Sequence, residues 1–580
     1  MNERTAWRWV AGAGLAMVAV AACAGVPAQP RAAKAQDWSI NAWGRRPPDA
    51  LMQAGSGRQC VSASGQPGIL FGIRDRRDGT AEMILPGWLQ PGKAYRLDAM
   101  ASAPGAASPV HVDVMFRRDG PHYQTAMVRG FDLGATPTRI QMQGIYFLED
   151  AGSVRVSLPQ GVPTICLTDV ALREIAAEEV GQPDGAFKVS DRLFGIHMLR
   201  LGEHNVWPRF NPGVVRLWDT GTTWNDLQPR QAPINWGQGP SGQRMRYFVQ
   251  HTLNKGDGAD VLMTLGMTPE WAVAEGAPNC DPAPYGRKAC HAPAKLDDWR
   301  AFVREVGQRF EGRVRFWEVW NEADIPMHWL DGAESLVAMQ RVAYEELKRL
   351  SPRNEVIGPN ITINGLSFLH QLLQAGAARY MDGVSVHAYF GRRPDLADAA
   401  IRNVRQMLVD RGLNLPIWNT EVAAGCGQPQ ECAFATQAEM VDDAQWALAQ
   451  GYVGEAALGV VNINYFTLET DNPEHGWVPM IASDLRTTTR FGRFMERLRN
   501  WLTGATVRLQ PPIVPGVTTV DVQLADGQQC KVMWGVRREP VKVDRSFLLA
   551  KATLSYIDGE PVPAGDVRVA RRPVLACAPK

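Results

Sequence analysis

The sequence predicts a multidomain α/β plus β protein, in which a central (β/α)8 TIM barrel is flanked by an N-terminal β-sandwich and a small C-terminal β domain. The chain has 580 residues, which is too long for one ordinary domain. Near both ends, short runs alternate polar and apolar residues, whereas the middle alternates apolar strands with amphipathic helices. With 45% hydrophobic and 21% charged residues, the composition is typical of folded domains.

The first 36 residues are predicted to be an export signal and a tether. Two arginines precede an uncharged run at 10–22, which is too short to span a bilayer as a mature helix. The next residue is Cys23, and the segment 20–23 resembles a bacterial lipoprotein processing site, where the cysteine is acylated. The alternative is an ordinary signal peptide that is cleaved later, near 33–36. We therefore expect an exported protein of the periplasm or cell envelope, with membrane contact only through a lipid anchor, or else a secreted protein.

The cysteines fit an oxidising compartment. Of the nine, Cys23 stands apart, and the other eight fall into couples: Cys60 with Cys166, Cys280 with Cys290, Cys426 with Cys432, and Cys530 with Cys577. We expect these eight to form disulfides, while lipidation would use the ninth. The couples are chosen by proximity along the chain, because connectivity does not follow from sequence. Because the cysteines are scattered and no C-x-x-C or H-x-x-x-H pattern occurs, no metal site is predicted.

The predicted domains follow the changes of pattern along the chain. Residues 37–180 carry period-two runs without a long helical pattern, which predicts an antiparallel β-sandwich that could bind glycan. Residues 187–503 carry apolar strands separated by helices, which suits a closed barrel better than an open sheet. Residues 504–580 return to alternating strands. The barrel strands are expected at 194–199, 214–219, 260–266, 314–322, 355–361, 383–389, 415–422 and 461–468.

Two glutamates end strands of the predicted barrel. Glu322 ends the fourth strand, in FWEVWNEAD, and Glu421 ends the seventh, in IWNTEVAAG. Active residues of such barrels lie at the C-terminal strand ends, and strands four and seven lie nearly opposite each other. The two carboxyl groups should therefore face each other, which suits glycoside cleavage by an acid/base and a nucleophile or base.

At these residues the chain resembles the clan A glycoside hydrolases, and within them family 39, over about half its length. The segment 320–322 resembles the clan's acid/base motif, and 420–421 resembles its nucleophile motif. The segment around Arg216 resembles the second-strand segment that supports the nucleophile, and His387 with Tyr389 resembles a sixth-strand pair near it. The resemblance implies a retaining (β/α)8-barrel glycosidase that forms a covalent glycosyl-enzyme intermediate.

Double displacement places opposite demands on the two carboxyl groups. Glu322 must be protonated when it acts, and burial beside an anion raises the pKa of a carboxyl group. Glu421 must stay ionised, which Arg216 and the hydroxyl of Tyr389 would favour. The resemblance implies that Asn321 binds the sugar 2-hydroxyl. No cofactor is expected, because this chemistry uses none.

Several candidate residues have a structural role as their alternative. Arg216 could balance Glu318, which we expect deeper in the barrel as half of a structural ion pair. Disulfides in the loops after strands three and seven would stiffen the rim of the cleft. The remaining candidates, each of which could instead belong to the core or anchor a loop, are His197, Trp218, Trp224, Asn360, His387 and Trp477.

The predicted function is that of a retaining β-glycoside hydrolase acting on a polysaccharide, with endo action on an exopolysaccharide favoured by the three domains and the envelope location. One alternative is an exo-acting β-xylosidase-like glycosidase. Others are a catalytically inactive glycan-binding envelope protein and an envelope scaffold, neither of which needs the paired glutamates. The net charge of +1 and the lack of a basic block predict no nucleic-acid partner, so we expect a polysaccharide or oligosaccharide.

Overall fold

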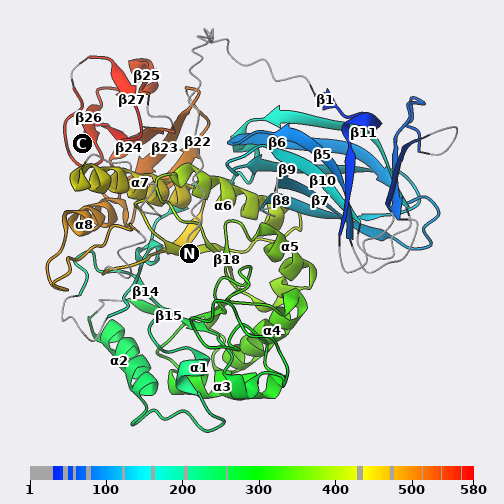
Figure 1. Ribbon diagram of the computed structural model, residues 1–580. Coiled ribbons are helices and arrows are strands. Elements are labelled where there is room, and N and C mark those ends of the chain that lie inside the picture. The colour runs from blue at the N-terminus through cyan, green and yellow to red at the C-terminus, as the bar shows by residue number, and fades with distance from the viewer. Residues whose placement is uncertain are drawn as a thin grey trace, which may run out of the picture.

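The computed structural model places the main elements of the chain (Figure 1). No helix of the described residues is long and apolar enough to cross a membrane. The expected export signal, with Cys23, lies outside the described residues, and so does the predicted disulfide partner Cys432. The structure describes residues 30–43, 50–55, 60–73, 80–119, 124–158, 164–200, 207–255, 259–426, 436–469, 476–512, 514–536, 539–563 and 565–579.

Two antiparallel sheets form the N-terminal part (Figure 1). Their inward residues alternate with outward ones, as in β6, because successive side chains of a strand point to opposite faces. Cys60 and Cys166 form a disulfide there. One sheet has the order β3 (Ala50–Ala54), β4 (Ile69–Ile73), β11 (Thr164–Ile175), β6 (Lys93–Ser102) and β9 (Thr138–Tyr146), with β1 (Arg31–Ala32) beside β11. The other has the order β2 (Ser39–Trp43), β5 (Thr80–Leu89), β10 (Gly152–Leu158), β7 (Val110–Arg118) and β8 (Thr125–Leu133).

A curled parallel sheet forms the barrel-like middle of the protein. Its strands follow the order β17 (Glu355–Ile357), β16 (Phe316–Val319), β15 (Asp260–Leu265), β14 (Val214–Leu217), β13 (Phe194–His197), β21 (Val460–Tyr465), β20 (Ile417–Val422), β19 (Val384–His387) and β18 (Ile361–Thr362). The first and last strands of this order are the two halves of the predicted fifth strand. A parallel bridge from Ile357 of β17 to Gly383, directly before β19, crosses the seam, so the sheet closes on itself.

Helices surround this sheet (Figure 1). In α3 the buried residues Trp299, Phe302, Val303 and Val306 follow helical spacing, which places one apolar face against the strands. The helices are α1 (Trp224–Leu227), α2 (Pro240–Lys255), α3 (Leu296–Arg309), α4 (Gly332–Leu350), α5 (Leu366–Gln374), α6 (Pro394–Val409), α7 (Gln437–Ala457) and α8 (Arg490–Leu502).

The C-terminal strands form a further antiparallel sheet. Cys530 and Cys577 lie opposite each other in neighbouring strands and form a disulfide. The first strand of this sheet, β12, lies at the start of the predicted barrel range but pairs here with β22. The order is β12 (Phe187–Lys188), β22 (Thr506–Gln510), β23 (Val517–Gln523), β24 (Gln529–Gly535), β28 (Val574–Cys577) and β26 (Thr553–Tyr556), and β25 (Val541–Val543) pairs with β27 (Val567–Val569).

Polar contacts attach the N-terminal sheets to helices of the barrel-like domain. Asn403 of α6 accepts a hydrogen bond from the N–H of Ile145 at 2.8 Å and donates to the carbonyls of Ile145 and Ala126. These strands, β9 and β8, are sheet edges, so Asn403 satisfies backbone groups that would otherwise lack partners. An ion pair of 3.0 Å joins Arg129 to Asp410 beside it.

Candidate active site

Glu322 lies three residues beyond β16 and does not end the strand, contrary to the prediction. Trp320 (φ 69°) and Glu322 (φ 41°) adopt left-handed backbone conformations, which end the strand ladder. The buried side chain of Asn360 holds this turn, because its Oδ1 accepts from the N–H of Glu322 and its Nδ2 donates to the carbonyl of Trp320. The Asn360 amide is thus occupied by the backbone, which differs from the pocket role expected of it.

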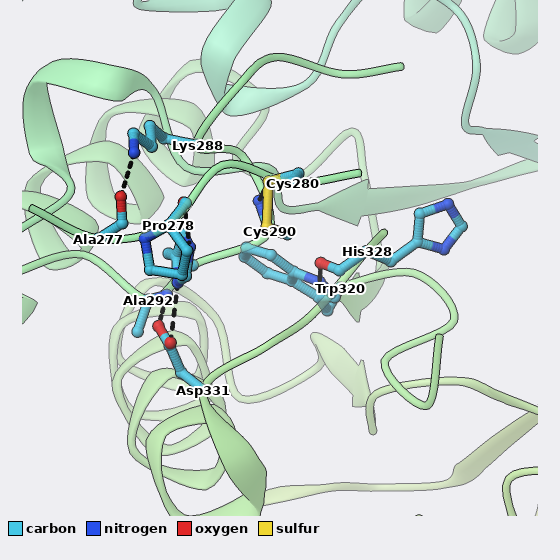
Figure 2. Close-up of a disulfide and its surroundings, with 10 residues drawn as sticks. Ala277, Pro278, Cys280, Lys288, Cys290, Ala292, Trp320, His328 and Asp331 are labelled. Carbon is cyan, nitrogen blue, oxygen red and sulfur yellow. Dashed lines mark hydrogen bonds and ion pairs between the residues drawn. A yellow bond between two sulfur atoms is a disulfide. The ribbon is translucent and has the colours of Figure 1, made fainter. Parts of the chain in front are cut away.

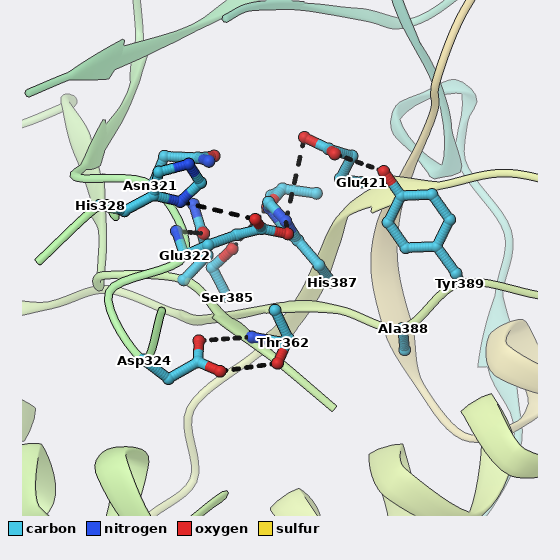
Figure 3. Close-up of polar contacts among 12 residues, drawn as sticks. Asn321, Glu322, Asp324, His328, Thr362, Ser385, His387, Ala388, Tyr389 and Glu421 are labelled. Carbon is cyan, nitrogen blue, oxygen red and sulfur yellow. Dashed lines mark hydrogen bonds and ion pairs between the residues drawn. The ribbon is translucent and has the colours of Figure 1, made fainter. Parts of the chain in front are cut away.

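The Glu322 carboxyl group contacts two histidines. Its Oε1 lies 2.9 Å from Nδ1 of His387, and its Oε2 lies 3.5 Å from Nδ1 of His328 (Figure 3). Burial, and after it the charge of Asp324, raises the pKa of Glu322 to about 7. A carboxyl group with such a pKa can be protonated at neutral pH and can also lose its proton there.

Glu421 lies within β20 and is surrounded by donors. The guanidinium Nη1 of Arg216 donates to its Oε2 at 2.8 Å, and the hydroxyl of Tyr389 donates to its Oε1. Burial raises the pKa of Glu421, and the Glu322 carboxylate adds to this, while His387, Arg216 and Tyr389 oppose it. A cation contacts Glu421 directly and does not contact Glu322, so Glu421 is the carboxyl group better stabilised as an anion.

Arg216 forms ion pairs with both Glu318 and Glu421. Its Nε and Nη2 donate to Oε2 of Glu318 at 2.8 and 2.6 Å, and Nη2 also donates to Oδ1 of Asn321 at 2.8 Å. Although burial raises the pKa of Glu318, Arg216 and nearby hydroxyl donors hold it below its usual value. Glu318 therefore forms the structural ion pair expected of it, and the same guanidinium reaches Glu421.

Among the described residues, two groups of histidines and carboxylates have atoms close enough to hold a metal ion. In the first, one nitrogen or oxygen each from Glu322, His387 and Glu421 lie within 4.8 Å of one another. Arg216 already places positive charge beside this group, which opposes a cation there. The second group is His111, Asp113 and His370, between β7 and α5. There Arg411 can only donate to Nδ1 of His370, and Nε2 of the same ring bonds Asp113 at 2.9 Å, so both ring nitrogens already have partners.

The rings of Trp218, Tyr285 and His328 form an aromatic wall beside Glu322. Tyr285 and His328 were not predicted from the sequence. The ring of Tyr285 lies 5.0 Å from that of Trp218 and 5.6 Å from that of His328. The hydroxyl of Tyr285 donates to Asp219 at 2.6 Å, and neither ring nitrogen of the buried His328 has a hydrogen-bond partner among the described residues. The position of Tyr285 between Cys280 and Cys290 was the available signal for it, whereas no pattern marks His328.

The disulfide between Cys280 and Cys290 is tied to the segment that carries Glu322 (Figure 2). The N–H of Leu330 donates to the carbonyl of Cys290 at 3.0 Å, and the N–H of Ala292 donates to Asp331 at 2.7 Å. Further along that segment, the indole of Trp320 donates to the carbonyl of His328 at 2.9 Å. Cys426, on the opposite rim, is also disulfide-bonded.

The remaining predicted residues divide between the site and the core. The half-buried Trp477 lies 5.2 Å from the ring of Tyr389, and its backbone pairs with Gly425. His197 is fully buried and bonds the carbonyl of Thr420 at 3.0 Å, which is a core role. Trp224 is fully buried and packs on Trp299 and Phe302, so it belongs to the core as well.

Solved structures that are similar to this chain include family 39 glycoside hydrolases. One, from the gut symbiont Bacteroides cellulosilyticus WH2, has 14% sequence identity and a TM-score of 0.47, and the match covers 82% of this chain and 96% of that one. A family 39 β-xylosidase from Caulobacter crescentus has 16% identity and a TM-score of 0.46, over 68% and 98% of the two chains. The catalytic domain of a family 30 xylanase from Talaromyces cellulolyticus has 12% identity and a TM-score of 0.45, also over 68% and 98%.

No protein-family model and no curated protein matches the sequence. The similar structures come from families of the clan that the motifs around Glu322 and Glu421 resemble.

Proposed function

We propose that the protein is a retaining β-glycoside hydrolase that cleaves a polysaccharide by double displacement. The observation that carries this proposal is the short approach of Glu322 to Glu421, whose nearest carboxylate oxygens lie within 4.8 Å. Retaining glycosidases hold their carboxyl groups roughly 5–5.5 Å apart, whereas inverting ones leave roughly 6.5–9.5 Å for a water. The short spacing favours direct attack by one carboxylate over attack by an intervening water.

In the first step Glu421 is the nucleophile and Glu322 is the acid. A Glu421 oxygen forms a bond to the anomeric carbon, and the bond from that carbon to the leaving oxygen breaks. The proton of Glu322 goes to the leaving oxygen, so no alkoxide has to form. Support for these roles comes from the donors on Glu421, which are Arg216 and Tyr389, and from the raised pKa of Glu322.

In the second step the roles of the two side chains reverse. Once Glu421 is an ester its negative charge is gone, so the pKa of Glu322 falls and its carboxylate can take a proton from water. That water attacks the anomeric carbon, and Glu421 leaves as a carboxylate. His387, whose burial lowers its pKa to about 4, is neutral and can keep its hydrogen bond to Glu322 in both steps.

The substrate that we propose is an exopolysaccharide cut within its chain, because aromatic rings flank the carboxyl pair on two sides. Tyr285 lies on the Glu322 side, against the ring of His328, and Trp477 lies beside Tyr389 on the Glu421 side. Such rings suit the apolar faces of sugars on both sides of the cleaved bond. We further propose that Asn321 binds a sugar hydroxyl through its Nδ2, since its Oδ1 is taken by Arg216. Exo action would need one end of this cleft to be blocked.

Export is part of the proposal. Three described disulfides favour an oxidising compartment, and the sequence around Cys23 favours a lipid anchor in the cell envelope. Replacing Cys23 by Ala should move the protein from the membrane fraction to the soluble fraction of cells. Partitioning that stays unchanged would reject the anchor and leave a cleaved signal peptide.

The product profile tests the activity itself. Wild type and Glu421→Gln are incubated with β-linked polysaccharides, and the masses of the products are read. Oligosaccharide ladders made only by wild type are expected, and monosaccharides alone would show exo action. If neither protein releases product while both bind glycan, the activity is refuted and a glycan-binding protein takes its place.

A further inference from the structure

A hollow on the outside of the barrel-like domain gathers five arginines from separate parts of the chain. Its volume is about 870 Å³, and we call it the arginine hollow after Arg200, Arg244, Arg246, Arg309 and Arg313. One follows β13, two lie on α2, one ends α3 and one lies in the turn after it. Figure 1 shows α2 on the outer side of the barrel-like domain, at the lower left. All five side chains are exposed.

Among the described residues that line this hollow, none is acidic. Arg244 donates to the carbonyl of Thr220 at 3.3 Å and Arg246 to the carbonyl of Trp236 at 2.8 Å, while Arg309 lies over the Trp236 ring at 5.6 Å. A guanidinium has five N–H donors, so these contacts leave most donors directed to solvent. Elsewhere in the protein, arginines meet carboxylates, as Arg155 meets Glu82.

Neutral groups in the hollow suit a sugar chain. Gln243, Arg246, Tyr247 and Gln250 follow the three- and four-residue spacing of one face of α2. Tyr247 is 43% exposed there, which is unusual for a large ring and leaves a face for stacking on a sugar. Amide groups of the two glutamines can bond hydroxyls. Clustered like charges repel each other unless an anion neutralises them, so the ligand should be anionic as well as rich in hydroxyls.

The hollow adjoins the candidate active site through the loop after β14. Arg244 bonds the carbonyl of Thr220, and the preceding residue, Asp219, accepts the hydroxyl of Tyr285 in the aromatic wall. The neighbouring loop residues Asp219 and Thr220 thus contact the aromatic wall and the hollow, respectively. Because the hollow is concave, it fits a single chain better than a flat lipid surface.

We propose that the arginine hollow binds an acidic polysaccharide, that is, a sugar chain with carboxylate groups. Carboxylates would pair with the guanidinium groups, and sugar rings and hydroxyls would meet Tyr247 and the glutamines. That the bound chain is also the one cleaved rests on the proposed function, whereas the binding itself does not. Sequence alone shows no basic block, because these arginines are scattered from 200 to 313.

The test measures binding of polygalacturonate and of a neutral glucan to the full chain carrying Glu421→Gln, so that turnover cannot consume a ligand. Polygalacturonate should bind and the glucan should not, and binding should weaken as salt rises, since salt screens exposed charges. Arg246→Gln/Arg309→Gln should weaken binding at least about tenfold. Arg246→Lys/Arg309→Lys should keep most of it, and the matched control Arg353→Gln/Arg508→Gln, which removes two exposed arginines elsewhere, should keep all of it.

The proposal is overturned by equal losses in the hollow and control variants, by absent polygalacturonate binding, or by binding only to vesicles of anionic lipid. Hydrolysis of an aryl glycoside by the protein with Glu421 intact distinguishes a failure of the proposed glycosidase activity from a failure of the proposed binding in the arginine hollow. Hollow variants should keep that activity, because no arginine of the hollow contacts either glutamate. Absent hydrolysis with intact polygalacturonate binding would reject the glycosidase and leave the hollow standing.

Discussion

The side-chain Oδ1 of Asn360 accepts a hydrogen bond from the backbone N–H of Glu322 at 2.5 Å, across 38 positions of sequence. The same amide donates to the carbonyl of Trp320, so it holds the two residues of this turn that have positive φ angles. A strained turn persists only where its surroundings hold it. The direction of the Glu322 carboxyl group thus depends on a side chain from the fifth strand position.

Asn360→Leu should lower the rate most where proton donation matters. Loss of these hydrogen bonds costs about 1–3 kcal/mol, and a displaced acid costs roughly 10²-fold in rate. We expect a large fall in kcat for glycosides with poor leaving groups and a small one for activated aryl glycosides. The control is Asn354→Leu, at another buried asparagine away from the site, which should lower the melting temperature without this leaving-group dependence.

Glu322→Ala should separate the acid from the nucleophile. Without the acid, poor leaving groups should lose roughly 10²–10⁴-fold in kcat/KM, whereas activated aryl glycosides need no proton and should lose less in the first step. Measuring both substrate types with Glu322→Ala and Glu421→Gln checks this, because the second variant should fail on both. Equal losses for Glu322→Ala on both substrates would reject its role as acid.

Activity on substrates with poor leaving groups should fall as pH rises through about 7. Burial and the charge of Asp324 raise the pKa of Glu322 to this value. The sign follows from the role, since the acid must carry its proton and loses it above its pKa. Asp324→Asn removes a nearby negative charge, so the alkaline limb of kcat/KM should move to lower pH. A limb that stays in place would mean that another group sets it.

Replacing Cys280 and Cys290 by Ser should lower activity, because the loop between them carries Tyr285 and is bonded to the segment bearing His328. Closing a loop of this length stabilises a protein by up to about 3 kcal/mol. The matched control replaces Cys530 and Cys577, whose sheet lies away from the site. That variant should lose stability with kcat unchanged, and a similar loss of kcat in both would contradict the local effect.

The sequence by itself determined the approximate strand positions of the curled sheet and the placing of Glu421 in a strand, and the three described disulfides match the couples chosen by proximity along the chain. The strands follow from local information, because apolar periodicity reports the burial of one element at a time. The two cysteines of each disulfide lie in the same predicted domain. The contact of Arg216 with Glu421 was also expected, from motif resemblance, and the structure contains it.

Only the tertiary structure decided which side chains surround the two glutamates and how they are held. The side chain of Asn360 reaches Glu322 because the left-handed turn after β16 brings the backbone N–H of Glu322 to the Asn360 amide. Apolar periodicity does not encode positive φ angles, so the sequence did not predict this contact. His328 and Tyr285 meet through loops, whose paths depend on contacts between distant residues. The arginine hollow arises in the same way, since charges scattered in sequence become neighbours only when helices pack around a closed sheet.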